Sequence, residues 1–275
     1  MKITTVWSVY FSATGTTEKV VTGIATAAAK LLGAQYRSRP FNRPESREQP
    51  LAFSKEDFVV LGIPVYAGRV PNLLLPFIKE KVSGNDTPAT AVTLFGNRSY
   101  DDALIELRDI MQENGFCCIS AGAFVGEHSF STTLGAGRPD ERDMALARRL
   151  GEETATKILR LAAAPSAAVH VKGSVPIRPY YTPRDRFGNP VNILKVKPKT
   201  DAAKCTGCGT CSNVCTMGSI DPSNAGLITG VCTKCCACVK RCPAGAKFFD
   251  DEGYLFHKRE LEEMYERRAE AELFI

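Results

Sequence analysis

The stretch ITTVWSVYFSATGTT, residues 3–17, decides the fold of the first half of the chain. Its first nine residues are rich in β-branched and aromatic side chains, which is typical of a buried β-strand. A short segment of small and hydroxyl residues follows, and a helical pattern then runs from Glu18 to Leu32. A strand that passes through such a loop into a helix is the opening unit of a parallel α/β sheet.

The alternation of strand and helix continues to about residue 161. The apolar runs DFVVLGIPVY, TAVTLFG and FCCISAGAFVG predict further strands, and a weaker strand lies near AQYRSRPF. Helical patterns separate the apolar runs, and a final helix is expected from about Pro139 to Leu161. Apolar strands that alternate with helices predict a parallel sheet covered on both faces. We therefore expect an α/β domain whose five strands follow the doubly wound order 2-1-3-4-5.

The loop after the first strand is a candidate phosphate site. In doubly wound sheets, ligands bind beyond the carboxyl ends of the strands. The loop has four hydroxyl side chains, a glycine for close backbone approach and a helix N-terminus behind it, which together suit a phosphate. It lacks the lysine of a Walker P-loop and the G-x-G-x-x-G fingerprint. The alternative is an ordinary Ser/Thr helix cap. The loop consists of Ser12, Ala13, Thr14, Gly15, Thr16 and Thr17.

Two cysteine runs occupy the last third of the chain. The first is Cys205-x2-Cys208-x2-Cys211-x3-Cys215, and the second is Cys232-x2-Cys235-x2-Cys238-x3-Cys242, followed by Pro243. This is the ligand spacing of bacterial two-cluster ferredoxins, in which the fourth cysteine of each run binds the other cluster. We therefore predict two [4Fe–4S] clusters. One binds Cys205, Cys208, Cys211 and Cys242, and the other binds Cys232, Cys235, Cys238 and Cys215.

Other readings of the cysteines fit the pattern less well. A zinc ribbon uses two C-x2-C pairs rather than a repeated four-cysteine run. Disulfides need an oxidising compartment, and the N-terminus reads as a strand rather than a secretory leader. Cys236 stands beside a predicted ligand and is interpreted as a spare buried thiol, with a ligand role as the alternative.

With these motifs in view, residues 1–162 resemble the flavodoxin family, whose S/T-x-T-G-x-T loop holds the phosphate of FMN. Residues 200–250 resemble a bacterial-type 2[4Fe–4S] ferredoxin. The whole chain is similar to the flavodoxin–ferredoxin fusion proteins of anaerobes. The resemblance implies a flavodoxin-like sheet, a small α+β ferredoxin-like domain, and FMN as the flavin.

The resemblance also implies two loops that frame the flavin ring. The first consists of Pro64, Val65, Tyr66, Ala67 and Gly68, and the second of Gly96, Asn97, Arg98, Ser99 and Tyr100. The two tyrosines are candidates for stacking on the ring, with a core or surface position as the alternative. His128, after the fifth strand, is a candidate proton donor to reduced flavin or to a substrate, with a hydrogen-bonded loop histidine as the alternative.

Length and composition agree with a soluble two-domain protein. The chain has 275 residues, 44% of them hydrophobic, and a net charge of +5 without a block of like charges. We expect a flavodoxin-like domain over residues 1–164, an extended basic connector over 165–199 with a short hairpin, and a ferredoxin domain with a C-terminal helix over 200–275. No segment is apolar enough for a membrane helix, and nucleic-acid binding is not indicated. Oxygen-sensitive clusters favour the cytoplasm of an anaerobe.

Three functions remain open from the sequence. The first is an electron-transfer protein that relays electrons between two clusters and an FMN, and serves redox partner proteins. The second is an FMN-dependent reductase of a small-molecule substrate, fed by its own ferredoxin domain. The third is a flavodoxin-like half that binds no flavin and serves as a docking scaffold. The oligomeric state stays open, a homodimer included.

Overall fold

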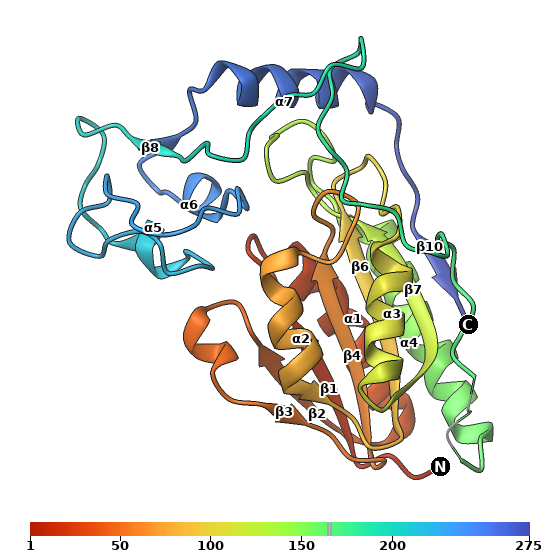
Figure 1. The fold of residues 1–275 in the computed structure, drawn as a ribbon. Coiled ribbons are helices and arrows are strands. Elements are labelled where there is room, and N and C mark those ends of the chain that lie inside the picture. Colours follow the sequence, from red (N-terminus) through yellow and green to blue (C-terminus); the bar gives the residue numbers. More distant parts are fainter. Residues whose placement is uncertain (164, 166) are drawn as a thin grey trace.

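A computed structural model describes residues 1–163, 165 and 167–275, and Figure 1 shows its central sheet. The parallel strands lie in the order β2-β1-β4-β6-β7. Numbered along the chain, this is the predicted order 2-1-3-4-5, so the flavodoxin-like winding is confirmed. The bounds are β1 Thr5–Tyr10, β2 Gln35–Pro40, β4 Asp57–Pro64, β6 Thr87–Phe95 and β7 Phe116–Val125.

Helices cover both faces of the sheet, as the continuous apolar strands predict. The alternation along β4 shows this directly: Phe58 and Val60 pack with α1 and α4, whereas Val59 and Leu61 pack with α2 and α3. These helices are α1 Thr16–Leu32, α2 Leu75–Lys81, α3 Ala103–Glu113 and α4 Glu141–Arg160. Short elements border them: η1 Pro44–Arg47, β3 Leu51–Ala52, η2 Asn72–Leu74 and β5 Val82–Ser83.

The sheet has a sixth strand, which the sequence did not predict. After helix α7 (Glu252–Met264) the chain returns along the sheet, and β10 (Glu272–Phe274) pairs antiparallel with β7. The tail is therefore helical only in its first part. The pairing covers the outer edge of β7, whose backbone groups would otherwise face solvent. Arg138 anchors the returning segment, because its guanidinium donates a hydrogen bond of 3.1 Å to the carbonyl of buried Ala269.

The cysteine-rich region contains only short regular elements. They are β8 Lys199–Thr200, α5 Thr210–Asn213, α6 Ala237–Lys240 and β9 Lys247–Phe248, with β8 and β9 paired antiparallel. Its buried apolar cluster consists of Cys211, Ile220 and Cys238. So small a core cannot supply much stability, and bound clusters would have to supply the rest.

The connector is bonded to both halves rather than free in solvent. The carbonyl of Cys118 accepts from Val169, and the buried carboxylate of Asp102 accepts from the guanidinium of Arg178 at 2.6 Å. Further on, Arg186 pairs with Glu260 of α7. The expected hairpin forms as a bridge between Arg184 and Pro190. The expected boundary at residue 164 lies outside the described residues, and the three-part division of the chain stays a prediction.

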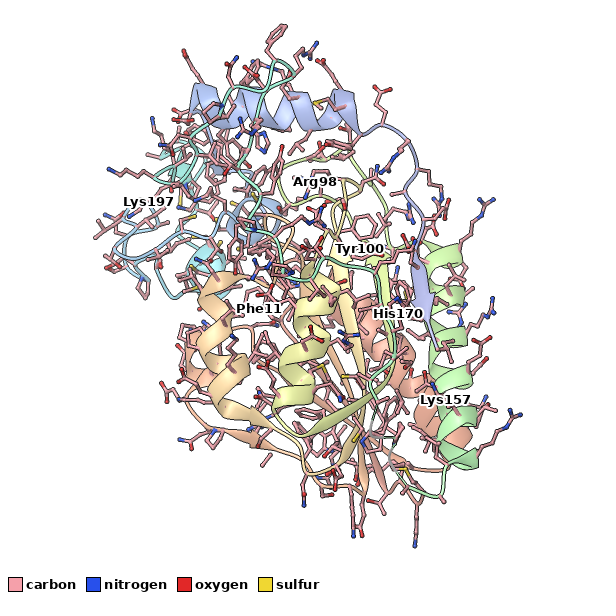
Figure 2. All side chains as sticks on the ribbon, turned by 45° about the vertical axis from the view of Figure 1, so that its right-hand side comes forward. Phe11, Arg98, Tyr100, Lys157, His170 and Lys197 are labelled. Atoms are coloured by element: carbon pink, nitrogen blue, oxygen red, sulfur yellow. The ribbon has the colours of Figure 1, made fainter. Side chains whose placement is uncertain are left out.

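The cysteine-rich region and α7 lie beyond the carboxyl ends of the parallel strands (Figure 1). In Figure 2, Arg98 and Tyr100 lie toward that end of the sheet, and Lys157 lies toward the opposite end. This is the edge where doubly wound sheets bind ligands. Among the described residues, no helix is long and apolar enough to cross a membrane.

Candidate cofactor sites

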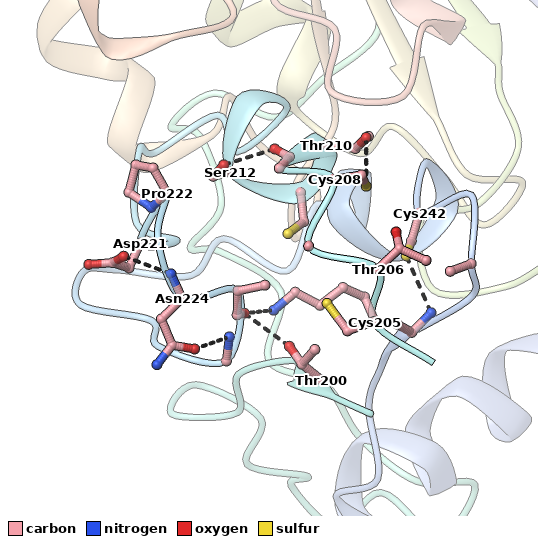
Figure 3. Close-up of a pocket in the computed structure, with 18 of the residues that line it drawn as sticks. Thr200, Cys205, Thr206, Cys208, Thr210, Ser212, Asp221, Pro222, Asn224 and Cys242 are labelled. Carbon is pink, nitrogen blue, oxygen red and sulfur yellow. Dashed lines mark hydrogen bonds between the residues drawn. The ribbon is translucent and has the colours of Figure 1, made fainter. Parts of the chain in front are cut away.

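Four cysteines from two distant runs surround one cavity of about 340 Å³ (Figure 3). We call this the outer site: Cys205, Cys208, Cys211 and Cys242. Gly207 and Gly209 take left-handed backbone conformations with φ of 69° and 72°, which only glycine adopts without strain. They let the chain turn tightly enough for the cysteines of the first run to face the same space. The fourth cysteine reaches it from the second run.

The remaining predicted ligands surround a second, smaller cavity. We call this the inner site: Cys215, Cys232, Cys235 and Cys238. Its volume is about 30 Å³, close to the share of one water molecule, so the surrounding side chains would have to part to admit a cubane cluster. The four cysteines of each site therefore suit a cluster, but only the cavity of the outer site is already large enough to hold one.

Backbone N–H groups point at the sulfurs of both sites. The Sγ of Cys242 accepts from Ala246 at 3.3 Å, and the Sγ of Cys215 accepts from Ser219 at 3.3 Å. Such bonds favour the thiolate, which is the form that binds iron. Among the described residues, no three or more His, Cys, Asp or Glu side chains lie close enough to chelate a single metal ion. The cysteines of each site instead surround a cavity.

Cys236 is a fifth cysteine at the inner site. It caps helix α6 in a left-handed conformation with φ of 58°, and 4% of its surface is exposed. Its Sγ lies 3.4 Å from the hydroxyl of Tyr254, whose ring stacks on Phe249 with centroids 4.2 Å apart. Burial raises the pKa of the Cys236 thiol to about 12. These contacts favour the expected spare thiol over a fifth ligand.

The loop Ser12–Thr17 presents backbone groups that suit a phosphate. Gly15 caps α1 in a left-handed conformation with φ of 98°. The Oγ of Ser12 accepts from the N–H of Glu18 at 3.1 Å, which is the capping role weighed above. Among the described residues, no acceptor is found for the N–H groups of Ala13, Thr14 and Gly15. A phosphate would satisfy these donors at the positive end of the helix dipole.

Two threonines of this loop face the sheet. A Cβ on Gly62 would lie 3.3 Å from the methyl of Thr17, which is buried, and a Cβ on Gly126 would lie 3.2 Å from the hydroxyl of Thr16. The half-buried Thr14 is therefore the better candidate for a hydroxyl contact to a phosphate.

The loop Pro64–Gly68 places Tyr66 beside the inner site. Tyr66 pairs with Arg69 in a tight turn and is half-buried. Burial, followed by the negative charge of Cys235 and Cys236, raises the pKa of its hydroxyl well above the ordinary value. Gly68 is required here because a Cβ would lie 2.3 Å from the carboxylate of Asp101. Val65 continues the sheet, and Ala67 accepts from Tyr181 of the connector at 2.8 Å.

The loop Gly96–Tyr100 is occupied by other parts of the chain. Tyr100 is 7% exposed and packs on Phe95, with ring centroids 5.6 Å apart, so it lies in the core. This position speaks against the expected stacking on a flavin. The amide of Asn97 donates to the carbonyls of Tyr265 and Arg267 at 2.7 and 2.6 Å. Ser99 and Arg98 bond to the residue that follows the loop, since Ser99 accepts from the N–H of Asp101 and Arg98 pairs with the Asp101 carboxylate.

His128 packs against this loop. A Cβ on Gly96 would lie 2.4 Å from its ring, and its Nδ1 accepts from the N–H of Phe130 at 3.1 Å. Burial, and then the charge of Lys240, lowers the pKa of His128 to about 3. A neutral imidazole with an occupied Nδ1 is a poor proton donor, which favours the loop-histidine alternative.

The sequence did not single out the residues that join the two halves. Lys240 donates from Nζ to the carbonyls of His128 and Ser131 at 2.7 and 2.9 Å and pairs with the carboxylate of Glu127. Arg43 donates to the carbonyl of Asn213, and Arg47 to that of Thr216, at 2.9 and 2.8 Å. Only the position of Lys240 between two predicted ligands could have drawn attention to it.

Comparisons with known proteins give matches in two parts of the chain. Residues 198–221 match the family described as 4Fe-4S binding domain. None of the curated proteins matches the chain. Three solved structures overlap the first part. A flavodoxin from the domain Archaea has 16% identity, covers 57% of this chain and 99% of its own, and gives a TM-score of 0.43. Flavodoxin 2 from Bacillus cereus has 15% identity, covers 56% of this chain and 99% of its own, and gives a TM-score of 0.42. The rubredoxin oxygen:oxidoreductase of Desulfovibrio gigas has 15% identity, covers 59% of this chain and 38% of its own, and gives a TM-score of 0.39.

The chain thus joins a flavodoxin-like α/β half to a region of the 4Fe-4S binding type. The winding rests on the strand order in Figure 1, and the iron–sulfur assignment rests on the family match.

Proposed function

We propose that the protein is an electron-transfer flavo-iron–sulfur protein that relays electrons between two [4Fe–4S] clusters and one FMN. The observation that carries the proposal is the crossed arrangement of cysteines. Three cysteines of the first run and the last cysteine of the second line the outer cavity. Four cysteines of the second run, Cys236 among them, and the last cysteine of the first line the inner cavity. This is the division of ligands that the spacing predicts for two clusters.

The cysteines would hold the clusters in unequal surroundings. Cys208 is exposed at the outer site, whereas each of the four predicted ligands of the inner site is half-buried or buried. An exposed site gives a redox partner protein close access. The inner site, which has no exposed ligand, lies beside Tyr66 and so next to the loops that we assign to the flavin.

The proposed flavin site rests on hydrogen-bond donors and an aromatic ring that the chain itself provides. The N–H groups of Ala13, Thr14 and Gly15 would bind the FMN phosphate, and the half-buried Tyr66 would pack against the ring. When bound, FMN would store one or two electrons, whereas a cluster passes one at a time. The connector lies along this edge, since Tyr181 donates to Ala67 and Tyr180 donates to Val70.

The alternative, an FMN-dependent reductase of a small substrate, has less support. Its candidate groups were Tyr66, Tyr100 and His128 around an open flavin face. Tyr100 lies in the core, and His128 is a neutral, hydrogen-bonded side chain. Lys240 also brings helix α6 onto the loop that contains His128. These contacts favour a covered flavin, as a relay requires.

The test is the cofactor content of the full chain, purified and reconstituted without oxygen. We expect about eight irons and eight sulfides, corresponding to two cubanes, and about one FMN per chain. Visible absorption and electron paramagnetic resonance of the reduced protein would identify the clusters. About four irons, or zinc without sulfide, would contradict two clusters, and a chain without flavin would favour the docking scaffold.

A further inference from the structure

Arg241 of the cysteine-rich region lies beside the candidate phosphate loop. Its Nη2 is 3.5 Å from the point that a Cβ on Gly15 would occupy. The side chain is exposed and, within the part of the chain that the structure describes, forms no hydrogen bond or ion pair. An arginine side chain thus lies at the same loop as the unpaired N–H groups of Ala13, Thr14 and Gly15.

The loop itself supplies no positive side chain. Its sequence from Ser12 to Thr17 contains small and hydroxyl residues only. The nearest lysine on α1, Lys19, donates from Nζ to the carbonyl of Pro139 at 2.8 Å. A phosphate monoester carries about −1.5 to −2 charges at neutral pH, and an arginine fork matches its oxygens well. Arg241 is placed to provide the charge that the loop lacks.

The position of Arg241 depends on how the cysteine-rich region docks. Its neighbour Lys240 is held by Glu127, His128 and Ser131 of the flavodoxin-like half. Its other neighbour, Cys242, lines the outer site. Because both neighbours of Arg241 are held, its backbone would lose less entropy on binding a phosphate than that of a residue on a free loop.

We propose that Arg241 is a phosphate-binding residue of the flavin site and sets a preference for FMN over riboflavin, which lacks the phosphate. The proposal rests on the function proposed above. It makes the flavin site composite, with N–H donors from one half and a cation from the other. FMN binding and docking of the two halves are then linked, and each strengthens the other by the same factor.

The test compares two ligands on one protein. The full chain with its clusters, freed of flavin by dialysis, is titrated with FMN and with riboflavin while flavin fluorescence is followed. In Arg241→Met we expect the Kd for FMN to rise roughly 10- to 100-fold, the range of a charge-assisted hydrogen bond, and the Kd for riboflavin to stay unchanged. Arg241→Lys should recover part of the FMN affinity. Arg160→Met, at the far end of α4, is the matched control and should change neither value.

The outcomes separate this inference from the proposed function. Equal losses of FMN and riboflavin binding in Arg241→Met would show a structural role only and overturn the inference. Unchanged FMN affinity in that variant would also overturn it, while leaving flavin binding intact. If the parent protein bound neither ligand, the flavin part of the proposed function would fail, and this inference with it. Iron content and circular dichroism of each variant show that the fold is kept.

Discussion

The outer and inner sites have the same cysteine spacing and very different surroundings. The outer site encloses about 340 Å³ and has Cys208 at the surface. The inner site encloses about 30 Å³ and has Cys236 and Cys238 buried beneath Phe249 and Tyr254. The outer site approaches the flavodoxin-like half through Arg241, the neighbour of Cys242, whereas the inner site lies against that half along Tyr66 and helix α6.

The difference shows that the spacing of the cysteines in the sequence and the packing around each site have separate effects. Spacing decides which sulfurs meet at each site. Packing decides what each site faces: Cys208 of the outer site is exposed to solvent, whereas the inner site lies beside Tyr66. Because exposure and hydrogen bonds to sulfur both set cluster potential, two sites with identical ligands can differ in potential. The four predictions below test this contrast, beginning with the largest expected effect.

Loss of one cysteine ligand should have a different effect on FMN binding at each of the two sites. Cys208→Ala and Cys235→Ala should each lower the iron content from about eight to about four atoms per chain, because each removes one cubane. Cys235→Ala should also weaken FMN binding, since the inner site packs against Tyr66. Cys208→Ala should weaken FMN binding less, because the outer site reaches the phosphate loop only through Cys242 and its exposed neighbour Arg241. The measurements are iron content and flavin fluorescence, and equal flavin loss in both variants would contradict the contrast.

Removal of Lys240 should separate the inner site from the flavin loops. Lys240 is 16% exposed and has three partners in the other half, so Lys240→Met should cost about 2–4 kcal/mol of docking free energy. Limited proteolysis and urea titration would measure it. Lys30→Met, at the exposed end of α1, is the control. A cost no larger than that of the control would mean that solvent already screens Lys240.

The connector offers a pH test of the same docking. Arg178 lowers the pKa of buried Asp102 below its ordinary value, so the carboxylate stabilises the folded state above the unfolded pKa. That stability should be complete above about pH 4 and fall as the pH drops further. Arg178→Met should cost about 1–2 kcal/mol at pH 7, a modest figure because Arg178 is 57% exposed, and should flatten this acid dependence.

Urea unfolding midpoints of the parent and of Arg178→Met, taken between pH 3 and pH 7, would measure this acid dependence. An acid dependence as steep in Arg178→Met as in the parent would show that other carboxylates govern it. Loss of FMN binding in Arg178→Met would show that the connector, rather than Lys240, keeps the inner site in place.

The fifth cysteine should matter least. Cys236→Ala should leave the iron content of both sites unchanged and cost about 1 kcal/mol, because it removes one buried sulfur and its contact to Tyr254. Iron analysis and thermal unfolding would check both values. A drop to about half the iron would make Cys236 a ligand and remove the assigned role of a neighbouring cysteine.

The strand order could be predicted because apolar runs alternate with helical patterns, and few sheet windings satisfy that alternation. The crossed cysteine sets follow from the two-cluster ferredoxin spacing, and the cysteines of each predicted set line a common cavity, while their role as cluster ligands stays a prediction. Strand β10 could not be predicted, since three residues carry no period and their pairing with β7 depends on an edge 147 residues earlier. The sequence placed Tyr100 on a loop as a candidate for stacking on the flavin, whereas in the structure its ring packs in the core beside Phe95.

The contacts between the halves also lay beyond sequence reasoning. Lys240 and Arg241 resemble surface side chains between two cysteines, and nothing nearby in the sequence names Glu127 or Gly15 as neighbours. Long-range docking of this kind depends on the folded shape of both partners. Only the structure brings the two basic residues to loops more than one hundred residues away.

The return of the chain to β10 makes the order of synthesis matter. The ribosome completes β7 and then adds about 150 residues before β10 emerges, which takes roughly 7 to 30 seconds at 5–20 residues per second. During that time the outer edge of β7 has no partner and could pair with another nascent chain. Every cysteine of both sites precedes β10, so cluster loading can begin within the same interval. A cell short of iron would therefore be expected to lose this protein through aggregation during synthesis, before electron transfer itself became limiting.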